Sequence, residues 1–540
     1  MPASQPYGVS SKGGLNTNLN QLEMLQTPGV ARRLTNFEVD PDGGYRRISG
    51  YKPFGEGSAV SPTGGTMTPI TGIHVYADGV IATAANDIYF SNDGITWIQL
   101  NKASVASGGD NYSTFNGRSE LSLTACGVYE FVTHEGTTDY GEVIMTDKSG
   151  NNKPFWFKMT GTGDLDTRTF YAKQLTIDGS TTAKFCTFHD GHTIAAGYPT
   201  NPNQIWYSGL LDPDDFTTSG SGTIALEDQI VGVRSFRDDL MIFCKNSIHR
   251  LVNINDASNI AVEPVTQNVG CLDGRSIQEI GGDLVFLSAD GIRTVAATAR
   301  IGDVELSSIS RQIQTVTSKI AEGIDNYIIT SGTIRDKSQY RLFYSTSGQS
   351  QTSSAGIIGT FTQNGFEWSE TEGIQAHGFS TGLDKDGIER LYHGDNSGFV
   401  YLHNSGNSFN SQGTEANIQA HYQTPDFDMG DIGTRKTLHY VRVSFTPEGT
   451  VEPLLRVRYD YEDTNTPQPD EYTMDQIPAP AIFGDDEFGD ATFGGLSDPM
   501  VRQPVQGSGN SVSFKISSND QNPPYAVNGF YVDYVPSGRR

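Results

Sequence analysis

The feature that most constrains the fold of this chain is the dipeptide Asp-Gly, which recurs along most of its length. When Asp-Gly or Asn-Gly separates two alternating apolar runs, it indicates a two-residue β-hairpin, because a type I′ turn needs positive φ at both central residues. Asp-Gly begins at Asp42, Asp78, Asp93, Asp178, Asp190, Asp273, Asp290 and Asp386, and Asn-Gly at Asn116, Asn364 and Asn528. So many hairpin signals in 540 residues predict an all-β fold.

The hairpin signals between residues 68 and 405 fall into groups of about 35 to 60 residues, a spacing typical of four-stranded β-propeller blades. The alternation is clearest in "HVYADGVIATA" and "VFLSADGIRTV". We count six to eight such groups, with seven favoured. Residues 56–405 are therefore predicted to form a β-propeller. One helix is expected within this range, because Ile309, Ile313, Val316 and Ile320 recur at helical spacing.

The pattern changes after residue 405. "LHYVRVSFTPEG", "NSVSFKISS" and "VNGFYVDYVP" alternate as the long strands of a β-sandwich do. Residues 406–540 are predicted to form a β-sandwich-like platform domain. Residues 1–55 are predicted to be an N-terminal arm and hairpin that pack with this platform, because "LTNFEVDPDGGYRRISGYKPF" has the turn chemistry of a hairpin and precedes the propeller.

A loop rich in Gly and Asp interrupts the C-terminal strands. Phe483, Phe488 and Phe493 recur every five residues in it, between acidic and Gly positions. Apolar residues in a polar loop often meet a partner, so these three are candidates for a partner-contact loop. The alternative is that they simply cover the sandwich.

The charge of the chain restricts its partners. Its net charge is −26, whereas a protein that grips nucleic acid needs clustered Lys and Arg, so tight DNA binding is not expected. The local exception is a group of four arginines that either pair with neighbouring acids or contact a partner or DNA: Arg32, Arg33, Arg46 and Arg47.

Membrane insertion is not expected, because no apolar stretch reaches the roughly 18 residues of a membrane helix. Without a recognisable secretory signal, the chain is expected to be made and kept in the cytoplasm.

The segment "YFSNDGITWIQL", residues 89–100, resembles the Asp-box of sialidase-type propellers but is one residue shorter between Asp93 and Gly94. A partial echo occurs at Asp290 and Gly291. Glycoside hydrolysis needs a pair of carboxylates, or a Tyr nucleophile with a substrate clamp, and neither set is recognisable. We therefore interpret both pairs as structural hairpin turns and expect no catalytic residue, no metal site and no cofactor.

Four stretches together resemble a known family: "GGLNT" with "GVARRLTNFEVDPDGGYRRISGY", "AAGYPTNPNQIWYSGLLDPDDF", "SIQEIGGDLVFLSADGIRTV" with "SISRQI", and "FGDDEFGDATFGG". The family is the β-propeller hub or nozzle proteins of short-tailed bacteriophages, also called packaged-DNA stabilisation proteins. The resemblance implies a structural virion protein of the tail, made in the host cytoplasm, which forms a homo-hexameric ring beneath the portal and its adaptor protein.

The resemblance also implies that double-stranded DNA is retained in the ring's channel and passes through it, and that tail fibres or tailspikes attach around the ring. Two other functions stay open. The chain could be a glycan-binding or sialidase-like β-propeller of a phage tail, or a soluble propeller scaffold for other proteins.

Overall fold

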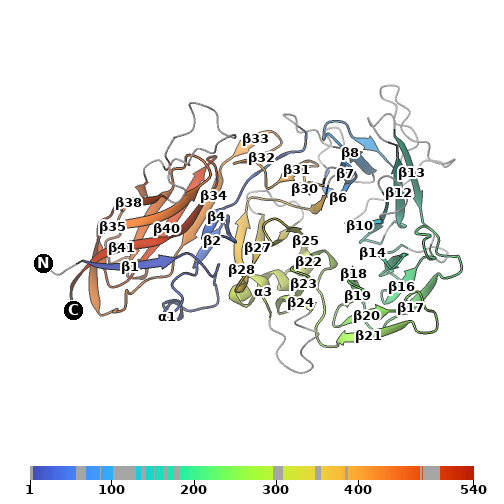
Figure 1. Cartoon of the computed structure of the whole chain (residues 1–540), viewed down its shortest axis with the longest axis horizontal. Helices are drawn as coiled ribbons and strands as arrows, with labels where there is room; N and C mark the ends of the chain where they lie inside the picture. The colour runs from blue at the N-terminus through green and yellow to red at the C-terminus, as the bar shows by residue number, and fades with distance from the viewer. Residues whose placement is uncertain are drawn as a thin grey trace.

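The computed structural model describes residues 4–55, 62, 68–84, 87–100, 129–134, 141–150, 152–161, 168–175, 177, 182–295, 308–346, 354–383, 387–474, 477 and 499–539. The protein is mostly β, as the sequence predicts. Figure 1 shows two parts lying end to end, a propeller at one end and a platform of long strands at the other. Both ends of the chain lie at the platform (Figure 1).

The propeller contains, among the described residues, six four-stranded blades and one three-stranded sheet between the fourth blade and the blade that begins with β25. The first strands of successive sheets contact one another in a closed ring, from β6 through β10, β14, β18, η2 with β22, β25 and β29 back to β6. The predicted β-propeller of six to eight blades is thereby confirmed.

The first four blades follow one another along the chain, and neighbouring strands within each blade are antiparallel. Their strands are β6 (Ile70–Tyr76), β7 (Gly79–Ala84), β8 (Asp87–Ser91), β9 (Ile98–Gln99), β10 (Tyr129–His134), β11 (Glu142–Asp147), β12 (Phe155–Thr160), β13 (Thr169–Gln174), β14 (Phe185–His189), β15 (His192–Ala196), β16 (Gln204–Tyr207), β17 (Gly222–Ala225), β18 (Ile230–Phe236), β19 (Asp239–Cys244), β20 (Ile248–Val252) and β21 (Ala261–Thr266).

The three-stranded sheet and the last two blades complete the ring. Their elements are η2 (Gly274–Ser276), β22 (Gln278–Ile280), β23 (Asp283–Ser288), β24 (Gly291–Thr294), β25 (Tyr327–Ile334), β26 (Gln339–Thr346), β27 (Ala355–Thr362), β28 (Gly365–Glu372), β29 (Gly378–Leu383), β30 (Glu389–Gly394) and β31 (Val400–His403). The predicted helix is confirmed as η3 (Arg311–Ile313) and α3 (Gln314–Glu322), which η4 (Ile324–Asn326) follows. Its Ile313, Val316 and Ile320 are buried, as the spacing predicts.

The last blade takes its fourth strand from the N-terminal segment. β5 (Tyr51–Pro53) pairs antiparallel with β31, and β32 (Phe409–Ser411) with β33 (Thr414–Ala416) extends the same sheet. This arrangement closes the ring, because an unpaired β31 would leave an open edge of backbone N–H and C=O groups. The end of residues 1–55 thus belongs to the propeller, whereas the sequence analysis placed that whole segment with the platform.

In the part of the platform that the structure describes, the strands form two sheets. One has the order β3-β4-β41-β35-β38, with β1 also on β41 and β39 also on β35, and the other contains β2-β34-β40-β36-β37. The elements are β1 (Gln5–Ser10), α1 (Gln21–Met24), β2 (Arg33–Thr35), β3 (Phe37–Val39), β4 (Tyr45–Arg47), β34 (Ile418–Gln423), β35 (Thr434–Pro447), β36 (Leu454–Tyr459), η6 (Asp460–Glu462), β37 (Tyr472–Thr473), β38 (Met500–Pro504), β39 (Ser508–Gly509), β40 (Val512–Asp520) and β41 (Tyr525–Arg539).

The platform and the propeller share a sheet. β2 pairs antiparallel with β34 of the platform and parallel with β28 of a blade, so one nine-stranded sheet runs through both parts. They also share a hydrophobic core, in which Leu342 and Trp368 of the blade belong to the same cluster as Phe514 of the platform. The two parts are therefore held together by backbone hydrogen bonds and by apolar burial.

Two of the predicted turns have a different geometry from type I′. β8 and β9 are separated by residues 92–97, and within that loop Gly94 has φ +72° while the Asp93 carboxylate accepts from the backbone N–H groups of Ile95 and Thr96. Between β23 and β24 the central residues are Ala289 and Asp290, because Ser288 pairs with Gly291. The type I′ prediction is therefore wrong at both places, although both pairs do lie at hairpin connections.

The type I′ prediction holds at another Asp-Gly. Asp190 and Gly191 separate β14 from β15 with φ +48° and +86°.

The three phenylalanines of the predicted partner-contact loop, Phe483, Phe488 and Phe493, lie outside the described residues. Of the helices in the described part of the chain, none is long and apolar enough to cross a membrane.

Candidate functional site at the junction of propeller and platform

The junction contains a carboxylate that is almost completely enclosed by protein. Glu38 lies on β3, between the buried residues Phe37 and Val39, and its side chain is 2% exposed. The β3–β4 hairpin holds it there, since a turn at Asp40–Gly44 uses two glycines of positive φ. Gly44 is needed for a second reason, because a Cβ at this position would lie 2.9 Å from the Val527 carbonyl of β41.

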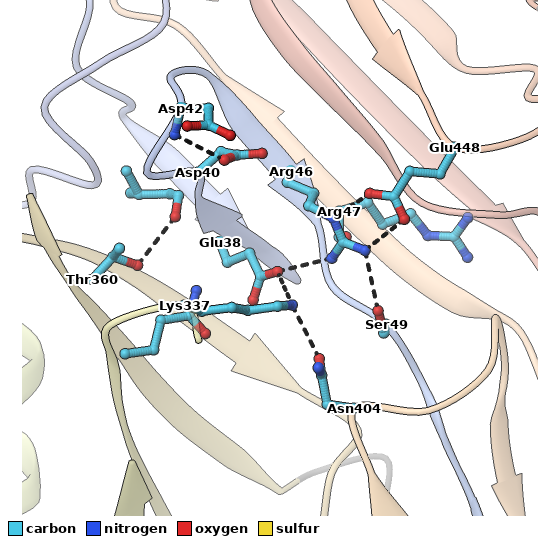
Figure 2. Close-up of polar contacts among 12 residues, drawn as sticks. Glu38, Asp40, Asp42, Arg46, Arg47, Ser49, Lys337, Thr360, Asn404 and Glu448 are labelled. Atoms are coloured by element: carbon cyan, nitrogen blue, oxygen red, sulfur yellow. Dashed lines mark hydrogen bonds and ion pairs between the residues drawn. The ribbon is translucent and has the colours of Figure 1, made fainter. Parts of the chain in front are cut away.

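Three cations converge on Glu38 from different parts of the chain, and Figure 2 shows two of them, Arg46 and Lys337. Arg46 Nη1 of β4 lies 2.8 Å from Glu38 Oε1, and Lys337 Nζ of the β25–β26 turn lies 2.7 Å from the same oxygen. Arg341 Nη2 of β26 lies 2.7 Å from Oε2. We call Glu38, Arg46, Lys337, Arg341 and Glu448 the junction cluster.

The cations of the junction cluster have further partners. Arg46 also donates to Glu448, which follows β35, with Nη2 2.7 Å from Oε2. Lys337 donates to Asn404 Oδ1 at 3.2 Å, as Figure 2 shows. Arg341 Nη1 lies 2.9 Å from His403 Nε2 of β31. The cluster thus joins the N-terminal hairpin, two blades and the platform.

The charges of the junction cluster control its ionisation. Burial alone would raise the pKa of Glu38, but the charges of Lys337, Arg341 and Arg46 outweigh burial and lower it to about 2. Burial lowers the pKa of His403 well below its usual range, and the charge of Arg341 acts in the same direction. Glu38 is therefore ionised and His403 neutral at neutral pH, so His403 accepts the hydrogen bond from Arg341.

The junction cluster suits a mechanical role better than a chemical one. Each ion is held by charged partners and hydrogen bonds, which offset the cost of removing it from water. Removing one partner from such a set leaves an uncompensated buried charge, which typically costs about 3–5 kcal/mol. The geometry therefore fixes the angle between propeller and platform, and any rotation at the junction would separate several ion pairs at once.

The four arginines that the sequence singled out have different environments. Arg46 belongs to the junction cluster, and Arg47 is 1% exposed, with Nη1 2.7 Å from Asp520 Oδ1 of β40. Arg33, on β2, is exposed, and Arg32 is 37% exposed and lies 3.5 Å from Asp426. The salt-bridge interpretation thus describes Arg46 and Arg47, which leaves Arg32 and Arg33 as the members of this group that a partner could reach.

Sequence reasoning missed Glu38, Lys337 and Arg341. A charged residue between apolar neighbours, as in "NFEVD" and "QYRLFY", is a signal of a buried ion. That signal names no partner, however, and Arg341 is 303 residues from Glu38. Among the described residues, no group of three or more His, Cys, Asp or Glu side chains is arranged to hold a metal ion.

Comparisons with known proteins identify no family for this chain. No family model and no curated protein sequence matches the chain. The extracellular domain of a putative hybrid two-component system from B. thetaiotaomicron is 9% identical over 67% of this chain and 40% of its own, with a TM-score of 0.32. Sqt1 of Saccharomyces cerevisiae is 9% identical over 66% of this chain and 98% of its own, with a TM-score of 0.36.

A third similar structure is the Pan2 WD40 domain of Neurospora crassa, which is 9% identical over 62% of this chain and 88% of its own, with a TM-score of 0.31. At these values none of the three resemblances supports a functional argument. The sheets described above establish by themselves that this chain is a β-propeller protein with additional antiparallel sheets.

Proposed function

We propose that this chain is a structural virion protein, the nozzle or hub subunit of a short-tailed phage tail. Six copies form a ring beneath the portal and its adaptor protein, the ring's channel retains DNA and conducts it during ejection, and fibres or tailspikes attach around it. The protein is made in the host cytoplasm and acts in the virion without enzymatic activity or a cofactor.

The observation that carries this proposal is the rigid connection between propeller and platform. A nozzle subunit has to transmit force between its neighbours above and its appendages without bending. A shared sheet, a shared apolar core and the buried junction cluster together suit that requirement. A freely hinged propeller, as expected of a scaffold that samples several partners, would need none of these.

The charge of the chain supports a passive channel. Each copy carries −26, so an acidic channel wall would repel DNA within a Debye length of about 8 Å at physiological salt. Sparse contacts would let DNA pass quickly, and a steric gate rather than an arginine clamp would retain it. Of the four sequence-selected arginines, Arg32 and Arg33 remain candidates for contact with an acidic adaptor or with DNA at the mouth of the channel.

The platform is proposed to be the assembly surface, with the propeller projecting outward. Negative-stain microscopy of the full chain is the direct test, and we expect six-fold rings with an open channel. A chain that stays monomeric at high concentration and binds bacterial surface polysaccharide would support the glycan-binding alternative instead. The full chain is needed, because a fragment that starts at residue 56 lacks β5 and leaves the last blade unclosed.

DNA binding tests the passive channel separately. We expect duplex DNA to bind weakly to the purified protein at moderate salt in a gel-shift titration. Submicromolar binding that falls steeply with salt and disappears in an Arg32→Ala, Arg33→Ala double variant would make the ring a DNA clamp instead. Arg250→Ala, which removes an exposed arginine on β20, is the matched control.

A further inference from the structure

The axis of the propeller contains a cavity of about 260 Å³ that plays no part in the proposed function. Residues of the first strands around the ring line it, among them His74 of β6, Phe131 of β10, Thr187 of β14, Arg234 of β18 and Ser331 of β25. η2 contributes Arg275. At this volume the cavity is smaller than typical sites for drug-sized ligands and suits a compact molecule.

An ion pair joins two parts of the propeller that are distant along the chain. Lys148, in the turn after β11, donates to the Asp273 carboxylate, which caps the start of η2. β11 belongs to the second blade and η2 to the connection that follows the fourth, so the two residues come from sheets that are not neighbours in the ring. The pair therefore ties together two sheets that are not neighbours in the ring.

The cavity lining carries basic groups. Arg234 and Arg275 are its two arginines, and no carboxylate occurs among the described residues that line it. Arg234 donates to the carbonyls of Val233 at 2.8 Å and Gly274 at 3.2 Å, which help to hold the guanidinium in place. Arg275 donates to the His377 carbonyl at 3.4 Å and lies 3.8 Å from Asp273. A positive lining is unusual in a chain of net charge −26.

The remaining lining combines hydroxyl groups with a pair of stacked rings. Hydroxyl groups come from several strands, namely Thr71, Thr187, Thr330, Ser331, Ser380 and Thr381. The rings of His74 and Phe131 stack with centroids 5.3 Å apart and planes at 5°. Burial lowers the pKa of His74 to about 4, so this wall is neutral at physiological pH. Hydroxyls can bond a hydroxylated ligand, and the aromatic wall can cover its apolar face.

We propose that this cavity is a binding site for a small ligand that carries a carboxylate or phosphate group. Guanidinium groups bind both oxyanions through charge-assisted hydrogen bonds, and such bonds are strongest where water is excluded. The oxyanion lies between Arg234 and Arg275, and the rest of the ligand meets the hydroxyls and the aromatic wall.

Calorimetric titration of the full chain tests the site, with inorganic phosphate and glucuronate as anionic probes and glucose as the neutral control. We expect saturable binding of at least one anion and none of glucose. The anion that binds distinguishes a plain oxyanion from an acidic sugar. Absence of binding by both anions, or equal binding of glucose, would refute the proposal.

Variants assign the binding to the cavity. Arg234→Gln should weaken anion binding at least tenfold, and Arg234→Lys, which keeps the charge, should retain part of it. Arg250→Gln, on the exposed side of β20, should bind as the wild type does. Thermal melts of the four proteins check folding. If folded Arg234→Gln binds the anion with wild-type affinity, the assignment is wrong. None of these outcomes depends on ring formation, so this proposal and the nozzle function can fail independently.

Discussion

Glu38 and Asp426 are two buried carboxylates whose surroundings shift their pKa in opposite directions. Glu38 has three cations within 2.8 Å, and its pKa is lowered to about 2. Asp426, in the platform between β34 and β35, is 0% exposed at its side chain and has a single cation, Arg32, at 3.5 Å. Burial raises the pKa of Asp426 to about 6 against the weaker effect of Arg32, and Glu462 and Asp460 add to the rise.

Comparing Glu38 with Asp426 separates the effect of burial on the pKa of a carboxylate from the effect of nearby cations. Both side chains lose their water, so desolvation penalises both charges. Only Glu38 has hydrogen-bonded cations to offset that penalty, whereas Asp426 has one cation, Arg32, at 3.5 Å, and the Tyr461 backbone lowers its pKa only weakly. A buried acid therefore stabilises this fold where it binds cations from several elements. It weakens the fold where its only nearby cation is one partly exposed arginine.

Glu38→Gln is expected to have the largest effect, because it removes the shared anion of three cations and leaves the fully buried Arg341 without a carboxylate partner. Loss of one partner from a buried charge network costs about 3–5 kcal/mol of unfolding free energy. Denaturant unfolding at pH 7 measures the loss. A decrease below about 1 kcal/mol would mean that the junction cluster contributes no more than a surface ion pair.

The pH dependence of the Glu38→Gln effect sharpens this prediction. An acid whose folded pKa is lowered contributes stability that is complete above its unfolded pKa of about 4.3 and disappears as pH falls through the folded value. The difference between wild type and Glu38→Gln should therefore be constant from pH 8 to pH 5 and shrink as pH falls from 4 towards 2. A difference that grows on acidification would contradict the assigned ionisation.

Asp426→Asn is expected to stabilise the protein at pH 8, by about 1–2 kcal/mol, since it removes a poorly paired buried charge. With a folded pKa raised above the unfolded value of about 3.9, the wild type binds its proton more tightly when folded, so its stability falls as pH rises from 4 to 6. The gain from the variant should appear across that window and vanish below pH 4. Thermal melts at pH 4 and pH 8 measure both limits.

Arg32→Gln is expected to act in the same place with a smaller effect. Removing the cation of Asp426 should destabilise the protein at pH 8 by roughly 1 kcal/mol or less, because solvent screens a side chain as exposed as Arg32. At pH 4, where Asp426 is protonated, the effect should vanish. An equal effect at both pH values would point to lost packing of the arginine stem and not to lost charge.

Glu263→Gln gives the smallest expected effect and serves as the control for the series. Glu263 pairs with Arg250 at 2.6 Å on the exposed face between β20 and β21. Exposed ion pairs contribute about 0–1 kcal/mol and weaken with salt. A change in the denaturation midpoint comparable to that of Glu38→Gln would show that burial and the number of cations do not determine how much each acid contributes to stability.

Local turn chemistry was enough to predict the β-propeller and the change of character near residue 405. It was not enough to divide the chain, because β5 and β2 are three-residue strands whose partners lie hundreds of residues away. The junction cluster was missed for a related reason. Arg46 was noticed as one of four clustered arginines, but its role depends on Glu448 and Lys337, and sequence spacing contains no information about such contacts.

The strand pairing also determines when this protein can fold during its synthesis. β5 is made early but meets β31 only after about 350 further residues, and β1, Gln5–Ser10, pairs with β41, Tyr525–Arg539. Closing such long loops has an entropic cost and slows folding. The nascent chain must therefore keep its first strands unpaired until the ribosome has translated nearly all of these 540 residues. A chain that stops before β41 lacks the central strand of the platform, and one that stops before β31 also leaves the last blade without the partner of β5.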